Sequence, residues 1–405
     1  MSLADNIEFL RRLPKLEGIA GLVAPGRGLR PDQQSPLAEV EGFGSNPGHL
    51  RMFAFVPAKL QQPRALVVVL HGCGQTAAGY DLGAGWSTLA KHYGFALLMP
   101  QQQPANNANV CFNWFNREDI ARGRGEACSI RQMIARMVGD YGIDARRVFI
   151  TGLSAGGAMT SVMLATYPEV FAAGAIIAGL PFGIAHGVRE ALSGMQVSAD
   201  RPAHALGNLV RNASKHRGPW PKVSVWHGSA DRTVNPANAD EIVKQWLDMH
   251  HLPLPPMSED TVDGHPHRMW WNADGETVVE SYTITDMAHG TPLGIADNDE
   301  RYGRQGAFLI EAGISSSYHI AKFFGLTGWI REPKPAAAES PSARLIPAVS
   351  PIPAPPPVPL PDLDTMPWPL ATPDSGPKPK RRRRDRGIDV GAVITRALTA
   401  AGLMK

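Results

Sequence analysis

The stretch Val148-Phe-Ile-Thr-Gly-Leu-Ser154-Ala-Gly-Gly157 decides how this chain folds. It starts as an apolar strand and continues as small residues with helical spacing, and Gly-x-Ser-x-Gly stands at the junction. A serine at such a sharp turn has a strained backbone, and Gly152 and Gly156 remove β-carbons that would clash with adjacent backbone. The pattern predicts that the Ser154 hydroxyl projects above a sheet edge as a nucleophile.

Strands and helices alternate on both sides of this turn. Apolar runs typical of strands buried on both faces lie at 65–70, 95–99, 148–150, 174–177, 223–226 and 278–284. Helical spacing occurs between them at 86–93, 130–141, 157–167 and 239–250, and again at 315–324. The alternation predicts an α/β fold with a mostly parallel central sheet flanked by helices. The long connections at about 101–126 and 182–220 are expected to form loops or a small cap over the carboxyl edge of the sheet.

A serine nucleophile needs a base and an acid, which in this arrangement follow in the order Ser, Asp or Glu, His, each after a later strand. Asp231 follows the strand at 223–226, and His289 follows the strand at 278–284. We therefore predict Asp231 as the acid and His289 as the base. Asp286 is an alternative acid, but it shares the loop of His289.

Four other histidines and one further aspartate have competing explanations. His71 and His227 stand at strand ends beside glycine and are expected to organise loops. His265 and His267 lie in a polar, hairpin-like segment into which no predicted strand leads, and Asp240 falls inside a predicted helix. None of the five is predicted to belong to the catalytic set.

A tetrahedral oxyanion needs backbone N–H donors. The first helical residue after the serine, Ala155, supplies one such donor, and the loop 71–76 after the first long strand should supply the other. We expect the second donor to be the N–H of Cys73. Three aromatic residues, Trp114, Phe112 and Phe115, are candidates for a wall around the acyl chain, with simple core packing as the alternative.

Taken together, several segments resemble the polyhydroxybutyrate (PHB) depolymerase family of serine esterases, within the α/β-hydrolase superfamily. The matching segments, spread over about 50–330, are Leu70-His-Gly-Cys-Gly-Gln-Thr76, Leu98-Met-Pro-Gln101, Cys111-Phe-Asn-Trp-Phe115, Gly152-Leu-Ser-Ala-Gly-Gly157 and His227-Gly-Ser-Ala-Asp231. The resemblance implies an α/β-hydrolase fold and hydrolysis of hydroxyalkanoate oligomers or short-chain acyl esters through an acyl-enzyme on Ser154. Its relatives include feruloyl and acetylxylan esterases, which are the alternative substrate class. A peptidase, an acyltransferase or a non-catalytic binding protein on the same scaffold is a more remote alternative.

The resemblance also bears on two local features. In secreted relatives the cysteine of His-Gly-Cys is often bridged, and Cys73 with Cys111 would be the counterpart here, whereas a reducing cytoplasm would keep both as thiols. In relatives an aromatic residue commonly follows the histidine, but here Gly290, Thr291 and Pro292 follow it. The resemblance therefore does not define the wall of the acyl pocket in this chain.

The two ends differ in composition from the middle. Residues 1–45 read as an N-terminal extension and 46–331 as the catalytic domain. Sixteen of the 36 prolines fall between Pro333 and Pro379, so 332–379 is expected to be a disordered linker. Residues 380–405 combine a basic run with a short amphipathic helix.

From 371 to 405 there are nine Lys or Arg and three Asp (9 − 3 = +6), so the other 370 residues carry 3 − 6 = −3 of the net +3.

These charges limit the classes of partner. The mildly acidic body gives no support to nucleic-acid binding by the catalytic domain. The basic tail either contacts an anionic surface or a partner protein, or is a solubilising extension. No Walker A loop, His-x-x-x-His pair or Gly-x-Gly-x-x-Gly turn is present, so neither a metal nor a cofactor is expected.

Localisation follows from the start of the chain. No 18-residue apolar run is present, and the first residues lack the apolar stretch of a secretory signal. A cytoplasmic location is therefore the prediction, with an extracellular one, as in many relatives, as the alternative.

Overall fold

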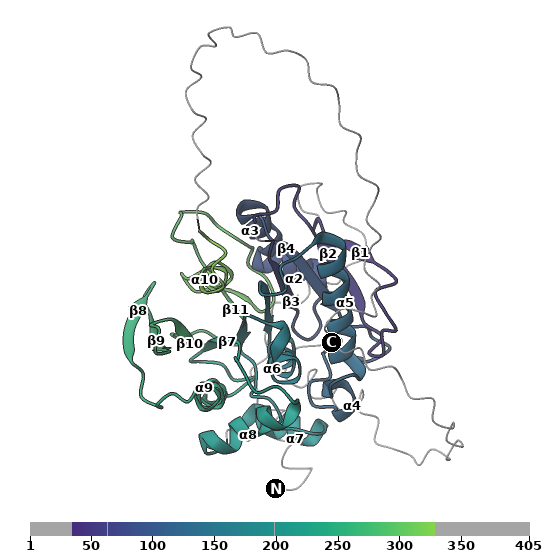
Figure 1. The fold of residues 1–405 in the computed structure, drawn as a ribbon. Helices are drawn as coiled ribbons and strands as arrows, with labels where there is room; N and C mark the ends of the chain where they lie inside the picture. The colour runs from purple at the N-terminus through teal and green to yellow at the C-terminus, as the bar shows by residue number, and fades with distance from the viewer. Residues whose placement is uncertain (1–34, 63, 198, 329–405) are drawn as a thin grey trace, which may run out of the picture. The chain divides into compact units, whose positions relative to one another are not determined.

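The computed structural model describes residues 35–328 except 63 and 198 (Figure 1). The Pro-rich linker, the basic segment and most of the N-terminal extension lie outside these residues. Within the described part of the chain, no helix has the length and apolar character needed to cross a bilayer.

A ten-stranded sheet forms the centre of the described domain. Its strands run in the order β1-β2-β4-β3-β5-β6-β7-β10-β9-β8. The bounds are Ala38–Val40 (β1), Arg51–Phe55 (β2), Leu66–Leu70 (β3), Ala96–Gln101 (β4), Val148–Leu153 (β5), Ala173–Ile177 (β6), Lys222–Gly228 (β7), Ser258–Val262 (β8), His265–Trp271 (β9) and Thr277–Ile284 (β10). The six strands from β4 to β10 are parallel, and the two strands at each edge are antiparallel. The α/β-hydrolase fold with a mostly parallel sheet is confirmed.

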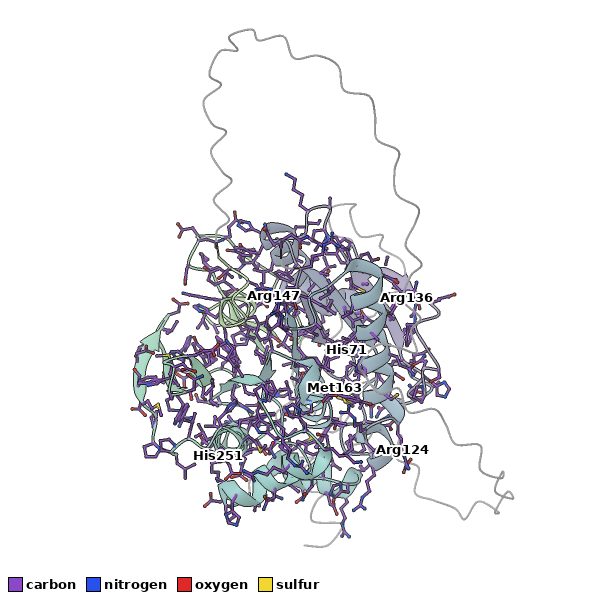
Figure 2. The ribbon with its side chains drawn as sticks, in the orientation of Figure 1. His71, Arg124, Arg136, Arg147, Met163 and His251 are labelled. Carbon is purple, nitrogen blue, oxygen red and sulfur yellow. A yellow bond between two sulfur atoms is a disulfide. The ribbon has the colours of Figure 1, made fainter. Side chains whose placement is uncertain are left out.

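Every residue of β3, β5 and β6 is buried, because helices cover both faces of the sheet. One face packs in a continuous apolar core against α2 (Ala77–Ala84), α3 (Trp86–Tyr93) and α10 (Ser316–Phe323). The other face is covered by α5 (Gly125–Tyr141), α6 (Ala155–Thr166) and α9 (Ala237–Met249). Figure 2 shows Met163 of α6 in the interior and Arg136 of α5 at the outside.

The long connections contain short helices. The first carries α4 (Arg117–Ile120), and the second carries α7 (Val188–Gln196) and α8 (Ala203–Ala213). The helix α8 packs on α9, so this second connection forms a small helical insertion. A two-stranded parallel sheet, β11 (Thr291–Leu293) with β12 (Leu309–Glu311), follows the central sheet, and a 3₁₀ turn lies at Pro168–Val170.

Two parts of the sheet depart from the prediction. Strand β1 lies inside the predicted N-terminal extension, so the fold begins before residue 46. The segment around His265 and His267 is β9, and β8 does lead into it. β1 has only three residues, two of them exposed, and the edge strand β8 is polar and largely exposed, while β9 mixes polar with aromatic residues. None of the three has the continuous apolar run that marks the central strands.

Candidate active site

Ser154 stands at the sharp turn between β5 and α6. Its backbone angles are φ 57° and ψ −117°, a left-handed conformation that a non-glycine residue adopts only under strain. A β-carbon at Gly152 would lie 2.4 Å from the carbonyl oxygen of Gly156, and one at Gly156 would lie 2.3 Å from that of Leu70. The strained serine and the steric need for both glycines agree with the prediction.

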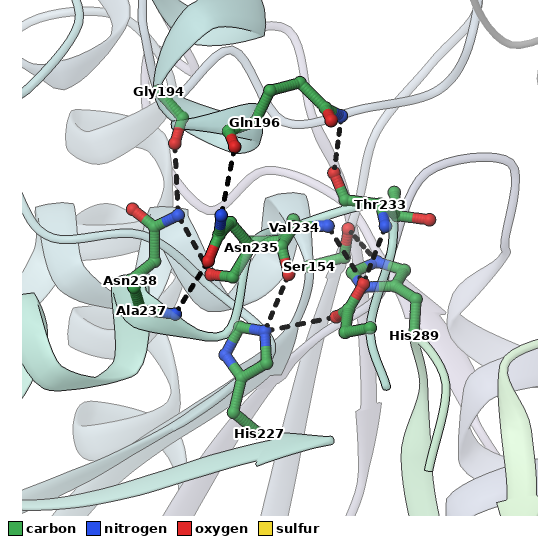
Figure 3. A network of polar contacts seen from close by, with 11 residues as sticks. Ser154, Gly194, Gln196, His227, Thr233, Val234, Asn235, Ala237, Asn238 and His289 are labelled. Atoms are coloured by element: carbon green, nitrogen blue, oxygen red, sulfur yellow. Dashed lines mark hydrogen bonds and ion pairs between the residues drawn. The ribbon is translucent and has the colours of Figure 1, made fainter. Parts of the chain in front are cut away.

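The structure brings the three predicted side chains into one row (Figure 3). The Oγ atom of Ser154 lies 2.8 Å from Nε2 of His289, and Nδ1 of His289 lies 2.6 Å from Oδ2 of Asp231. Asp231 follows β7 and His289 follows β10, and these strands are parallel neighbours. The carboxyl ends of parallel strands lie at one sheet edge, which is why residues so distant in sequence meet here.

The hydrogen bonds assign the hydrogen on the His289 ring. A carboxylate only accepts, so Nδ1 carries the hydrogen and donates it to Asp231. Nε2 is left free to accept the hydrogen of the Ser154 hydroxyl. This is the tautomer that a general base for Ser154 requires.

Four donors surround the Asp231 carboxylate. Oδ1 accepts from the backbone N–H groups of Thr233 and Val234 at 2.8 and 2.9 Å, and Oδ2 receives His289 and, at 3.1 Å, Nε2 of His227. Burial by itself would raise the pKa of Asp231, but the hydrogen bonds from His227 and His289 outweigh it and hold that pKa well below its ordinary value. The Asp231 carboxyl group is therefore ionised at neutral pH.

The other acids and histidines considered from the sequence lie apart from this row. Asp286 is exposed, and its backbone N–H binds the Ser229 hydroxyl. Asp240 pairs with Arg268 on the surface. His265 contacts the carbonyl oxygen of Ala312, and His267 lies between Asp260 and Glu280.

The oxyanion loop, residues 71–76, lies directly against the serine turn. A β-carbon at Gly156 would lie 2.6 Å from the carbonyl oxygen of His71, so this loop and the start of α6 are in backbone contact. The N–H of Ala155 opens α6, and the first N–H groups of a helix have no acceptor within it. Cys73 lies in the loop, next to Gly74, whose N–H donates to Asn109 at 2.9 Å. The positions of Cys73 and Ala155 are compatible with the predicted pair of donors.

A disulfide joins Cys73 to Cys111. The expectation that both cysteines stay as thiols is wrong for this structure. The bond ties the oxyanion loop to the long connection after β4, and Cys128 on α5 is a free thiol. Sequence alone left this pairing open because it depends on how two loops meet in space.

A buried polar network supports the oxyanion loop from behind. Nδ1 of His71 donates to Gly72 at 2.8 Å, and Nε2 accepts the backbone N–H of Gln102 at 3.1 Å. Burial lowers the pKa of His71 to about 4, against the opposing effect of the Gly72 hydrogen bond. The Gln102 amide continues to Glu126, which also receives two N–H groups of Asn113 at 2.8 and 2.7 Å. Figure 2 places His71 in the interior, as an organiser of its loop.

The predicted aromatic wall is only partly compatible with the structure. Phe112 has no exposed surface and packs on the His71 ring with centroids 4.9 Å apart, so it belongs to the core and the prediction of a substrate wall is wrong for it. Trp114 and Phe115 each keep 8% exposure and contact each other edge to face. For these two the wall remains a prediction.

Two residues of the site were not predicted. The Phe308 ring lies edge-on to the His289 ring, with centroids 6.0 Å apart, and is half-buried. Its loop has no periodic pattern that could have placed it. His227 was expected to organise a loop, and its contact with Asp231 could have been anticipated only from the spacing of four residues between them.

One group of side chains away from the row offers possible metal ligands. Ligand atoms of Asp263, Asp297 and His319 lie within 4.8 Å of one another. His319 already pairs with Asp263 at 3.1 Å, and Lys322 pairs with Asp297 at 2.7 Å. These side chains pair with one another, and none of them belongs to the row at Ser154.

The chain is similar in sequence to several known proteins. The family model described as "Esterase PHB depolymerase" matches residues 52–252. The chain is 47% identical to poly(3-hydroxyalkanoate) depolymerase C of Paucimonas lemoignei over 293 residues, which cover 72% of this chain and 70% of that protein. It is 33% identical to feruloyl esterase B of Neurospora crassa over 297 residues, covering 72% of this chain and 92% of that one.

A solved structure shows the same fold. Acetyl xylan esterase from Aspergillus awamori superposes with a TM-score of 0.59 at 25% identity, over 72% of this chain and 99% of that one. The chain belongs to the PHB depolymerase family of α/β-hydrolase esterases and is an ester hydrolase.

Proposed function

We propose that this enzyme hydrolyses carboxylic esters of short hydroxyalkanoate oligomers through an acyl-enzyme on Ser154. The observation that carries the proposal is the continuous row of hydrogen bonds from the Ser154 hydroxyl through His289 to the buried Asp231 carboxylate. A serine hydroxyl is a weak nucleophile until an adjacent base accepts its proton, and this row provides that base.

In the acylation half-reaction the Ser154 Oγ attacks the ester carbonyl carbon while His289 Nε2 takes the hydroxyl proton. The ionised Asp231 stabilises the imidazolium that forms and holds its ring in place. The N–H groups of Cys73 and Ala155 donate to the tetrahedral oxyanion, each contributing about a hundred- to a thousandfold in rate. When the intermediate collapses, the alcohol leaves with the proton from His289 Nε2.

In the deacylation half-reaction water replaces the alcohol. His289 Nε2 takes a proton from the water as its oxygen attacks the acyl carbonyl carbon. Collapse of the second tetrahedral intermediate breaks the bond to Ser154 Oγ, which recovers the proton from His289. The carboxylic acid leaves, and the enzyme returns to its starting state.

The substrate class rests on the similarity to the P. lemoignei depolymerase. The feruloyl and acetylxylan esterases among the relatives make carbohydrate-linked esters the competing class. Oligomers of 3-hydroxybutyrate, a simple butyrate ester, acetylated sugars and feruloyl sugars, assayed side by side, separate the two. Highest kcat/KM on the hydroxybutyrate oligomers supports the proposal, and highest kcat/KM on feruloyl or acetylated sugars replaces it.

The role of Ser154 is tested by the variant Ser154→Ala in the full-length protein. We expect ester hydrolysis to fall by at least about 10⁴-fold, together with loss of covalent labelling by a fluorophosphonate. The surface serine variant Ser45→Ala is the matched control, because Ser45 is exposed, accepts a hydrogen bond from Gln132 and lies outside the row. Near-full activity in folded Ser154→Ala would end the mechanism.

The Cys73–Cys111 disulfide bears on where the enzyme works. Disulfides persist in oxidising compartments and are rare in a reducing cytosol. We therefore favour the extracellular alternative over the cytoplasmic prediction. Fractionation of the native host, with activity measured in the culture medium and in the cell lysate, tests this location.

A contact of the basic C-terminal segment with an anionic surface is a proposal from charge alone. Binding of the full chain to polymer granules or anionic vesicles, compared with that of a chain ending at Arg331, tests it. Equal binding of the two proteins would remove the proposal.

A further inference from the structure

His227 lies in the interior, next to the last residue of β7. Its side chain is 3% exposed, and it stands in register with Thr283 of β10. Gly228 follows it, and a β-carbon there would lie 2.2 Å from the carbonyl oxygen of Met287. Close backbone packing against β10 and the loop that follows it thus holds His227 in place behind the loop that carries Asp231.

One ring nitrogen of His227 makes both of the polar contacts that this side chain has among the described residues. Nε2 lies 3.0 Å from the carbonyl oxygen of Val234 and 3.1 Å from Oδ2 of Asp231, as Figure 3 shows. A carbonyl oxygen only accepts, so the hydrogen must be on Nε2, where both acceptors share it. Nδ1 is buried and has no hydrogen-bond partner among the described residues. Buried polar groups normally have hydrogen-bond partners, and in this ring only Nε2 has them among the described residues. We therefore look for the role of His227 in the contacts of Nε2.

We propose that His227 is a positioning residue for the Asp231 carboxylate. Through one shared N–H it binds Oδ2 directly and holds the carbonyl of Val234, whose own N–H binds Oδ1. His227, Val234 and the Asp231 carboxylate are therefore linked in a closed ring of contacts. A donor on each carboxylate oxygen keeps the group from rotating away from His289. This inference rests on the proposed catalytic role of Ser154, Asp231 and His289.

The Asp231 loop is also anchored at its far end, to the helical insertion. The N–H of Asn235 donates to Met195 at 2.7 Å, and its side-chain amide donates to Gln196 at 3.1 Å. Gln196 in turn donates to the carbonyl of Thr233 at 3.2 Å. These bonds to α7 keep the loop folded when His227 is replaced, so the loss of His227 is expected to affect the carboxylate rather than the fold.

Two substitutions in the full-length protein separate the donor from the bulk of the ring. His227→Leu removes the N–H, and we expect kcat to fall about ten- to a hundredfold with KM changed less than about twofold. His227→Gln places an amide N–H near the position of Nε2, and we expect it to recover most of kcat. If His227→Leu does not fold, His227→Asn replaces it, since the shorter amide reaches only the position of Nδ1.

His250→Leu is the matched control. His250 also contacts a backbone carbonyl through Nε2, that of Pro221 at 3.1 Å, but at the opposite end of β7. We expect it to lower the melting temperature and leave kcat unchanged. A merely structural role for His227 would produce the same pattern in His227→Leu.

The outcomes are distinguishable from failure of the proposed function. If Ser154→Ala is inactive while His227→Leu keeps a kcat within about threefold of the parent, the positioning role is wrong and the triad stands. The same conclusion follows if His227→Gln and His227→Leu are equally impaired. If Ser154→Ala itself stays active, the proposed mechanism fails first.

Discussion

The Ser154 hydroxyl lies 2.8 Å from Nε2 of His289, although 135 residues separate the two along the chain. Their meeting depends on two strand ends. Ser154 follows β5, His289 follows β10, and β6 and β7 lie between them in the sheet. The loop after β10 must therefore extend across the sheet edge, and a β-carbon at Gly290 would lie only 2.8 Å from the carbonyl of Phe308.

The acid of the row can be identified by replacing the two aspartates that the sequence offered. Asp231→Asn removes the acceptor that selects the tautomer of His289, so we expect kcat to fall by about 10⁴-fold. Asp286→Asn, in the loop of His289 itself, should leave kcat within about twofold of the parent. Asp286 is exposed, and an exposed side chain outside the row contributes little to folding or catalysis. Steady-state hydrolysis of a butyrate ester measures both, and equal losses in the two variants would contradict the assignment.

Glu126 should make stability depend on pH. Burial raises its pKa from 4.5 to about 8, and Asp119 adds to this against the hydrogen bonds from Asn113 and Gln102. The folded protein then keeps a proton that the unfolded chain releases above pH 4.5. The free energy of unfolding consequently falls as pH rises from about 4.5 to 8, by up to about 1.4 kcal/mol per pH unit from this group.

Urea unfolding across this pH range, with Glu126→Gln beside the parent, isolates that contribution. Glutamine does not titrate, so the difference in unfolding free energy between parent and variant should shrink or reverse as pH rises. Glu118→Gln, at an exposed site paired with Arg124, is the control and should run parallel to the parent. A Glu126→Gln curve that also runs parallel to that of the parent would show that folding does not raise the pKa of Glu126.

The Cys73–Cys111 bridge should stabilise the domain. It closes a loop with a sequence separation of 38 residues. The double variant Cys73→Ser with Cys111→Ser is expected to lose about 3–4 kcal/mol of unfolding free energy by the chain-entropy argument. Thermal unfolding with and without reductant measures this loss. Cys128→Ser should unfold like the parent, and a parent insensitive to reductant would argue against a bridge.

Phe308 should affect the choice of acyl group. Its ring lies beside His289, and the N–H of Thr291 fixes its carbonyl at 2.8 Å in a left-handed backbone, φ 61°. Phe308→Ala removes an apolar ring beside His289. We expect kcat/KM to fall about tenfold for branched or longer acyl esters and much less for acetate.

The control for this prediction is Phe323→Ala, because Phe323 lies on α10 and lines a separate cavity of about 430 Å³. Its replacement should leave the ratio of kcat/KM between acyl esters unchanged. An unchanged ratio in Phe308→Ala as well would mean that the acyl wall lies elsewhere, with Trp114 and Phe115 as the remaining candidates.

Local constraints in the sequence determined the serine turn and the order of the triad. Only glycine is compatible with the backbone approach at Gly152 and Gly156, and an apolar run long enough for a strand buried on both faces can be recognised without any partner. Asp231 and His289 could be selected because strand ends of a parallel sheet meet at one edge whatever lies between them.

Only the tertiary structure decided the contacts between irregular segments. The Cys73–Cys111 bridge, the Phe308 ring beside His289 and the burial of Phe112 all depend on how loops pack, and loop residues carry no period from which a direction can be inferred. His227 belongs to both groups. The sequence predicted its place at a strand end. Its bond to Asp231, however, depends on the loop of residues 228–234 folding back on the strand that precedes it.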